Sequence, residues 1–236
     1  MSTDLQSPGR GRGFIVAAIV VGVIVLAAIV LAATFLFRGG DNNAGPEPAP
    51  TPTSSPITDA DPSVCGLDGF EETSSLDAAP DNKWELVGTV AAPTDPAVGP
   101  GEVQDGLPSC YAHTAEGALF AAVNFIAAGT DASLGPKLIA LVAPGPGRNA
   151  LEADSSSGGA SNLRAQVAGF KVSAYSADSA TIDVAMNYST GQLVSIPLKL
   201  QWAEGDWKIE MTSEGELPLA PAQLQNLGGY TPWSGA

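Results

Sequence analysis

An uncharged apolar stretch near the N-terminus constrains this chain more than any other feature of its sequence. It holds 24 residues, from Phe14 to Phe37, and only Gly22 and Thr34 interrupt its apolar character. A helix rises about 1.5 Å per residue, so roughly 20 apolar residues cross the hydrocarbon core of a bilayer. We therefore predict a transmembrane helix over residues 14–37, which places everything beyond it on one side of a membrane.

The flanks of the apolar stretch predict its orientation. Arg10 and Arg12 precede it, and Arg38 follows it before the chain turns acidic. The excess of arginine on the N-terminal side favours a cytoplasmic tail over residues 1–13 and an extracytoplasmic C-terminal domain. A cleaved signal peptide is the alternative. Its apolar region usually holds only 7–15 residues, so the sequence favours an uncleaved signal anchor and a single-pass protein of the cell membrane.

Charge excludes one class of partner. The chain has 236 residues, of which 10 are basic and 25 acidic, and beyond Arg38 seven basic residues stand against 24 acidic ones. A surface with this balance repels nucleic acid and anionic lipid headgroups at long range. We therefore predict no nucleic-acid partner.

Composition divides the part beyond the membrane into a linker and one domain. Residues 38–63 contain six prolines and few apolar side chains, which predicts a Pro/Thr/Ser-rich disordered linker with polyproline II character. Residues 64–236 are long enough for one domain with its own core. The first half of this domain reads as a strand over Trp84–Val90, a loop over 91–109 and two helices, one from Thr114 to Gly129 and one over Ser133–Val142.

The second half of the domain changes to a period of two. After a loop over 145–162 with a single helical turn near Leu151, apolar residues alternate between Ala168 and Met211. Short turns separate these runs, which predicts an antiparallel meander with one buried face and an α+β domain. Pro197 implies an edge or a bulge, and a short helix is expected over 221–227. The buried face is predicted to consist of Ile182, Val184, Met186, Ile196, Leu198 and Leu200.

The two cysteines, Cys65 and Cys110, are predicted to form a disulfide, because they lie beyond the membrane span. A metal site and a catalytic thiol are the alternatives. Either one would need a nearby imidazole or other partner, and His113 is the single histidine of the chain. A histidine just before a helix start more often caps or packs than catalyses.

No motif for catalysis or cofactor binding occurs in the sequence. There is no G-x-S-x-G elbow, no phosphate-binding glycine loop and no calcium-loop spacing. We therefore predict no catalytic residue, no cofactor and no metal, and a protein that is not an enzyme. Tyr230 and Trp233 are candidates for partner contacts, and the alternative, which we favour, is that they fold back on the meander.

The end of the meander resembles NTF2-like domains. Residues 198–209 read LKLQWAEGDWKI and match the W-x-x-G-x-W-K-[IV] pattern that closes many of them. The resemblance covers about residues 110–212 and implies a cone, in which a curved sheet wraps the helix over Ala115–Ala128. The apolar inner face argues against the isomerases and hydratases of that fold.

The order of tail, span, linker and NTF2-like domain is similar to bitopic assembly proteins of type IV secretion and conjugation machines. Residues 63–67, 84–89 and 110–114 also resemble uncharacterised actinobacterial single-span membrane proteins associated with mobile elements. The resemblance implies a non-enzymatic, membrane-anchored component or accessory of a conjugation or secretion apparatus. Its partners would be other membrane or apparatus proteins, with homo-oligomerisation left open. The alternative is an exported binding module for a small ligand or cell-wall fragment, using an NTF2-like pocket.

Overall fold

The alternating apolar pattern of the C-terminal half forms an antiparallel sheet. A computed structural model describes residues 62–153 and 164–234, all within one compact unit. The strands of the meander pair in chain order, and they are β5 (Ala165–Ser176), β6 (Ser179–Tyr188), β7 (Leu193–Ala203) and β8 (Asp206–Ile209). This confirms the predicted meander, and together with the helices it makes the domain α+β.

The inner face of the meander is the core of the domain. Five of the six residues predicted for this face are at most 1% exposed, and Ile196 is partly buried against them. Two register shifts interrupt the pairing of β5 with β6, at Val167/Gly169 and at Val172/Ala174. Such bulges bend a strand and increase its twist.

Pro197 lies at an edge, as predicted. Its neighbours on the outer side of β7 are two separate strands, because β8 pairs residues 200–203 and β9 (Ala222–Leu224) pairs residues 193–195. Proline has no backbone N–H to give to a ladder. The gap between β8 and β9 is therefore the place on β7 where a proline is tolerated.

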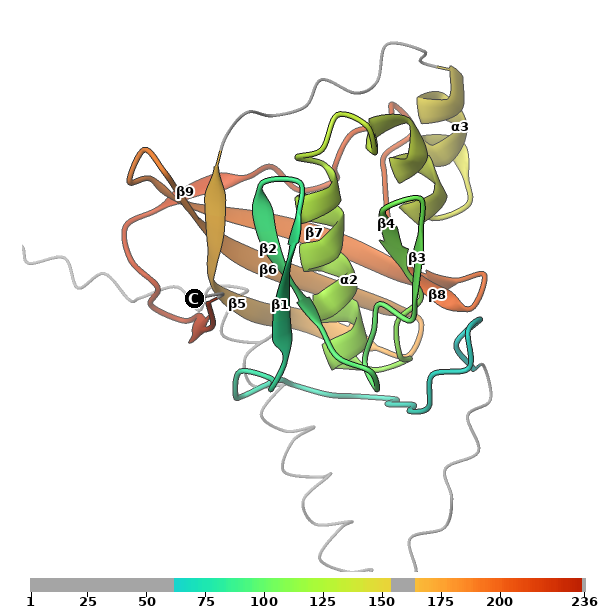
Figure 1. Cartoon of the computed structure of the whole chain (residues 1–236), viewed down its shortest axis with the longest axis horizontal. Coiled ribbons are helices and arrows are strands. Elements are labelled where there is room, and N and C mark those ends of the chain that lie inside the picture. The colour runs from blue at the N-terminus through green and yellow to red at the C-terminus, as the bar shows by residue number, and fades with distance from the viewer. Residues whose placement is uncertain (1–61, 154–163, 235–236) are drawn as a thin grey trace, which may run out of the picture. The chain divides into compact units, whose positions relative to one another are not determined.

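Helix α2 (Ala115–Ala128) packs against the inner face of the sheet (Figure 1). Thr114 caps it by accepting the N–H of Gly117 at 3.0 Å, as the sequence predicts. Eleven of its 14 residues are buried, so the helix is covered on more than one side. A helix that is apolar around its circumference is buried on all sides.

Two β-hairpins contact α2 in addition to the sheet. They are β1 (Lys83–Val87) with β2 (Val90–Thr94), and β3 (Glu102–Gln104) with β4 (Leu107–Ser109). The prediction of one strand over Trp84–Val90 was wrong, because Gly88 adopts φ +58° and turns the chain back. The prediction of a loop over 91–109 was also wrong, since this range holds three strands.

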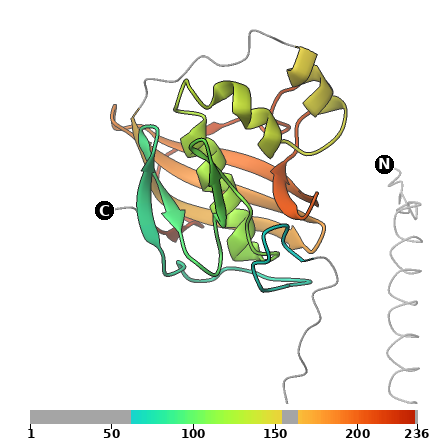
Figure 2. The same cartoon turned by 45° about the vertical axis from the view of Figure 1, so that its right-hand side comes forward.

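The remaining helices follow α2 at one end of the sheet (Figure 2). The predicted helix over Ser133–Val142 is a 3₁₀ helix, η1 (Gly135–Leu141), which stops where Val142 bridges to Ile209 in β8. Helix α3 (Pro146–Ala153) replaces the expected loop with a single turn. Proline suits the first position of a helix, and Arg148 ties α3 to Glu204 at 2.7 Å.

The C-terminal segment adds strands rather than a helix. The predicted helix over 221–227 was wrong, because β9 pairs with the outer edge of β7 and β10 (Thr231–Pro232) pairs with β5 at the opposite edge. Residues 217–234, which we call the C-terminal strap, thus run from one edge of the sheet to the other.

The predicted tail over 1–13, the span over 14–37 and nearly all of the linker over 38–63 lie outside the described residues. In the part of the chain that the structure describes, no helix has the length and apolar character that crossing a membrane requires.

Candidate functional site

Cys65 and Cys110 form the predicted disulfide, with their Cα atoms 6.2 Å apart. The hydroxyl of Ser63 lies 2.9 Å from the sulfur of Cys110. The backbone at Gly101 passes so close that a Cβ there would meet the sulfur of Cys65 at 2.5 Å. The disulfide therefore fixes the start of the domain, and the cysteines offer neither a thiol nor a metal ligand. Within residues 62–153 and 164–234, no group of three or more His, Cys, Asp or Glu could hold a metal ion.

His113 is engaged in packing. Its ring is 2% exposed and stacks on Trp202 with the centroids 3.7 Å apart and the planes nearly parallel. The edge of Phe70 contacts it at 5.0 Å, and its Nε2 lies 2.7 Å from the carbonyl oxygen of Ala177. This is the packing role that the sequence favours for the residue.

A buried ion pair near the disulfide was not predicted. Asp206 is 1% exposed and accepts the backbone N–H groups of Cys110 and Tyr111, each at 3.0 Å. Lys208 donates to the same carboxylate at 3.2 Å and to the carbonyl oxygen of Ala140 at 3.1 Å. Burial raises the pKa of Asp206, while Lys208 and the N–H groups oppose that shift. These contacts join β8 to the disulfide loop and to η1.

The structure separates the two candidates for partner contacts. Trp233 is 6% exposed and lies among the rings of Trp84, Phe120 and Phe170, so it folds back into the core. Tyr230 is partly exposed, and its hydroxyl donates to Asp183 at 2.7 Å on β6. Both residues therefore hold the C-terminal strap against the sheet.

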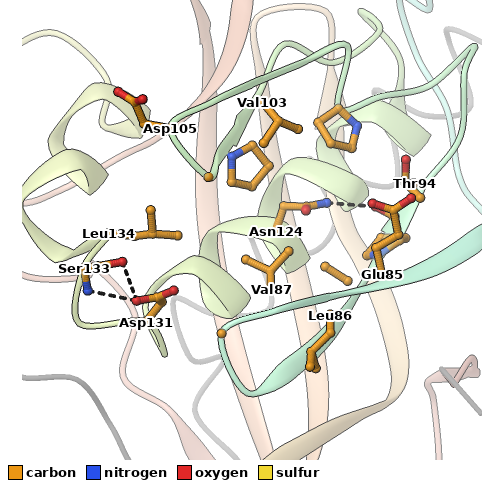
Figure 3. Close-up of a pocket in the computed structure, with 16 residues that line it drawn as sticks. Glu85, Leu86, Val87, Thr94, Val103, Asp105, Asn124, Asp131, Ser133 and Leu134 are labelled. Atoms are coloured by element: carbon orange, nitrogen blue, oxygen red, sulfur yellow. Dashed lines mark hydrogen bonds between the residues drawn. The ribbon is translucent and has the colours of Figure 1, made fainter.

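A groove lies between the two hairpins on α2, and we call it the hairpin groove (Figure 3). Its volume is about 320 Å³. Val87 from β1, Val103 from β3 and Leu134 from the segment after α2 provide apolar lining, together with prolines 93, 100 and 108. Val103 points into the groove and is 62% exposed (Figure 3), and Leu86, which is 75% exposed, also belongs to the lining.

Three carboxylates stand around the hairpin groove, and no lysine or arginine is among its lining residues. They are Glu85 on β1, Asp105 in the turn between β3 and β4, and Asp131 after α2. Asp131 accepts the backbone N–H and the hydroxyl of Ser133, and these hydrogen bonds lower its pKa. Lys137 approaches Asp105 at 3.9 Å, with both side chains largely exposed.

Asn124 of α2 provides a polar group at the centre of the groove (Figure 3). The residue is 2% exposed, and its side-chain nitrogen donates to the carbonyl oxygens of Pro93 and Phe120, each at 3.0 Å. Two carbonyl acceptors fix which end of the amide is nitrogen. No donor from the described residues reaches the amide oxygen, and this oxygen is not one of the fully enclosed atoms that lack a partner. It is therefore an acceptor open to the groove.

A second hollow of about 250 Å³ lies where α2 ends against the sheet. Phe125, Ile126, Met186 and Tyr188 are among its lining residues, and no charged side chain lines it. It offers apolar contact without a group that could orient a ligand by charge.

Sequence reasoning missed the hairpin groove, because it treated residues 91–109 as a loop. One signal was present. Asp105-Gly106 between Val103 and Leu107 is the Asp-Gly pattern of a two-residue hairpin turn, and φ is positive at both turn residues. No sequence pattern predicts the role of Asn124, since this role depends on the position of β2 in the fold.

Comparison with known proteins identifies one family. The model of a domain of unknown function, DUF8175, matches residues 44–232. No curated protein and no solved structure matches the chain.

Proposed function

The chain belongs to the DUF8175 family, whose function is unknown, so we propose a function from its own structure. We propose that it is a non-enzymatic, membrane-anchored module that works through protein–protein contacts outside the membrane. The hairpin groove carries this proposal. It is the place where an exposed apolar side chain, Val103, faces a concave surface with polar groups around it. Interaction sites are commonly apolar at the centre and polar at the rim.

Further observations support an extracytoplasmic location of the domain and a function other than catalysis. The Cys65–Cys110 disulfide suits an oxidising compartment, which agrees with an extracytoplasmic domain behind a span over residues 14–37. The two charged side chains buried in the interior, Asp206 and Lys208, are bound to each other and to the backbone. His113 is stacked on Trp202, so these groups serve the fold.

The proposals of an NTF2-like cone and of a role in a conjugation or secretion apparatus rest on the resemblance of the sequence to such proteins. Helix α2 on the apolar face of a bulged meander supports an NTF2-like cone. With one span and a proline-rich linker, this arrangement supports a role as a component or accessory of a conjugation or secretion apparatus. The excess of acidic residues in the chain is compatible with protein partners and disfavours nucleic acid as a partner.

A photo-crosslinking amino acid at position 103 tests the proposal in cells. We expect covalent adducts to one or a few extracytoplasmic or membrane proteins, identified by mass spectrometry. The matched control is position 64, because Val64 is also an exposed valine, 67% exposed, and is not among the residues that line the groove. Adducts of equal yield and identity at both positions, or none at 103, would exclude the groove as the contact site.

A small-ligand binding module is the second candidate function. The apolar hollow beside Phe125 and Met186 favours it, since ligand pockets are lined mainly by apolar side chains. A thermal-shift screen of apolar ligands on the full chain tests it. Stabilisation that Ile126→Lys abolishes would support this function, since Ile126 lines the hollow and is only partly buried, and stabilisation that persists in the variant would exclude the hollow.

A further inference from the structure

The hairpin groove has the features of a receptor for one basic side chain, and this inference rests on the proposed function. The groove has three carboxylates around it and no cationic side chain among its lining residues. Hydrogen bonds from Ser133 lower the pKa of Asp131, so that carboxylate is charged at neutral pH. The field in the groove therefore attracts positive charge and repels acidic segments.

The walls of the groove suit the stem of a long basic side chain. Lysine and arginine combine an apolar stem with a cationic head, and they bury the stem along apolar surface. Val87, Val103 and Leu134 provide apolar surface inside the groove, while the carboxylates lie at its margins. A basic group of a partner would add to the contacts that Asp105 makes with Lys137 and that Asp131 makes with Ser133, whereas a purely polar partner would leave Val103 exposed.

Asn124 gives an independent indication of a hydrogen-bond donor in the ligand. Asn124 is 98% buried. Its side-chain nitrogen donates to the carbonyl oxygens of Pro93 and Phe120, and its side-chain oxygen opens into the groove. An acceptor that opens into the groove needs a donor from any ligand that fills the groove, because a ligand without one would bury the oxygen unpaired. The ammonium of lysine and the guanidinium of arginine are donors only, so they match this acceptor as well as the surrounding charge.

The size of the groove sets the form of the ligand. A volume of about 320 Å³ lies at the lower end of the range for small-molecule pockets. It accommodates a side chain with its flanking residues, and not a folded element such as a helix. We propose that the hairpin groove binds an exposed segment of a partner protein by inserting a lysine or arginine, whose head reaches Asn124 and the carboxylates around the groove.

Selection of short random peptides displayed on phage tests this proposal on the full chain in detergent. The peptides are selected on the wild-type chain and then depleted on Val103→Asp, so that only groove-dependent binders remain. We expect lysine or arginine at one fixed position in these binders. Replacing that residue by norleucine, which keeps the stem and loses the charge, should weaken binding at least about tenfold.

Variants of the carboxylates supply the second readout. Glu85→Gln and Asp105→Asn leave the buried core untouched, and each should weaken binding about two- to fivefold and reduce its dependence on salt. Val64→Asp, at an exposed position that does not line the groove, should leave binding within about twofold. Asn124 is not varied, because its amide also holds β2.

The outcomes separate this inference from the proposed function. Groove-dependent peptides without a fixed basic residue, or with unchanged affinity for the norleucine form, would overturn the inference and leave the contact role intact. Failure to select any groove-dependent peptide, together with crosslinks at position 103, would also overturn it, because the partner would then present a folded surface. Failure of the crosslinks at 103 would remove the proposed function itself.

Discussion

The two sides of α2 differ in how completely they are covered. Towards the meander, the helix faces apolar side chains such as Ile182, Leu198 and Leu200, which are fully buried. Towards the hairpins, the cover is discontinuous and leaves the hairpin groove, with Val103 exposed and Asn124 at its centre. The comparison indicates that the continuous core lies on the sheet side, and our proposal assigns recognition to the hairpin side. Single exposed apolar residues are common on protein surfaces, so Val103 is informative because it lines a groove.

Replacing Trp233 tests whether the core extends to the C-terminal strap, and we expect it to cause the largest loss in the free energy of unfolding. Trp233→Ala removes a ring that contacts Trp84, Phe120 and Phe170 and should lower the free energy of unfolding by about 3–5 kcal/mol. Urea unfolding of the full chain in detergent, followed by circular dichroism, measures this. Leu86→Ala is the control, with an expected change within about 0.5 kcal/mol. Equal losses in the two variants would show that the strap does not belong to the core.

The disulfide tests the contribution of the segment that opens the domain. Cys65→Ser with Cys110→Ser removes a cross-link between residues 45 positions apart, and should lower the free energy of unfolding by about 2–4 kcal/mol. The same urea unfolding measures the loss, and treatment of the wild-type chain with reductant should reproduce it. A double variant as stable as the wild type would contradict a structural role for the bond.

The start of α2 should give a smaller, pH-dependent effect. The pKa of Glu116 is raised from its ordinary value of 4.5, first by burial and then by the charges of Asp95, Glu71 and Asp81. The native state then binds the proton more tightly than the unfolded state. The contribution of Glu116 to the free energy of unfolding is therefore largest below the pKa of its carboxyl in the unfolded state. This contribution is lost as the pH rises through the higher pKa of the carboxyl in the folded state.

Glu116→Gln removes this dependence. Since the carboxyl is only partly buried, the gain at neutral pH should be less than about 1 kcal/mol. Thermal unfolding between pH 4 and pH 7 should show a flatter decline in Tm for the variant than for the wild type. An unchanged slope would show that neither burial nor the neighbouring carboxylates raise the pKa of Glu116 in the folded state.

The sheet side of the molecule could be predicted from the sequence, and the hairpin side could not. The meander and its inner face follow from a period of two, which depends on local pattern alone. Helix α2 was predicted but its cover on all sides was not, although its sequence AEGALFAAVNFIAA is apolar around the circumference, which signals such cover. Gly88 and Asp105-Gly106 are local turn signals, which the predictions of one strand over 84–90 and a loop over 91–109 overlooked.

Other features depend on contacts between distant residues. Asp206 meets Cys110 and Tyr111 across about 95 positions of sequence, and the pairing of β9 with β7 depends on the edge that Pro197 interrupts. Neither has a signature in a single sequence. The orientation of Asn124 likewise follows from the carbonyl oxygen of Pro93, which only the folded hairpin places there.

The measurement that most directly tests the division between the two sides of α2 is a paired readout on Val103→Asp and Val64→Asp in the full chain, because Val64 is similarly exposed and does not line the groove. Both substitutions place a carboxylate on an exposed apolar position. We predict that both leave the free energy of unfolding within about 0.5 kcal/mol, and that Val103→Asp alone reduces capture of crosslinked partners in cells by at least about tenfold. Equal capture by the two variants, or a loss of stability confined to Val103→Asp, would contradict the account.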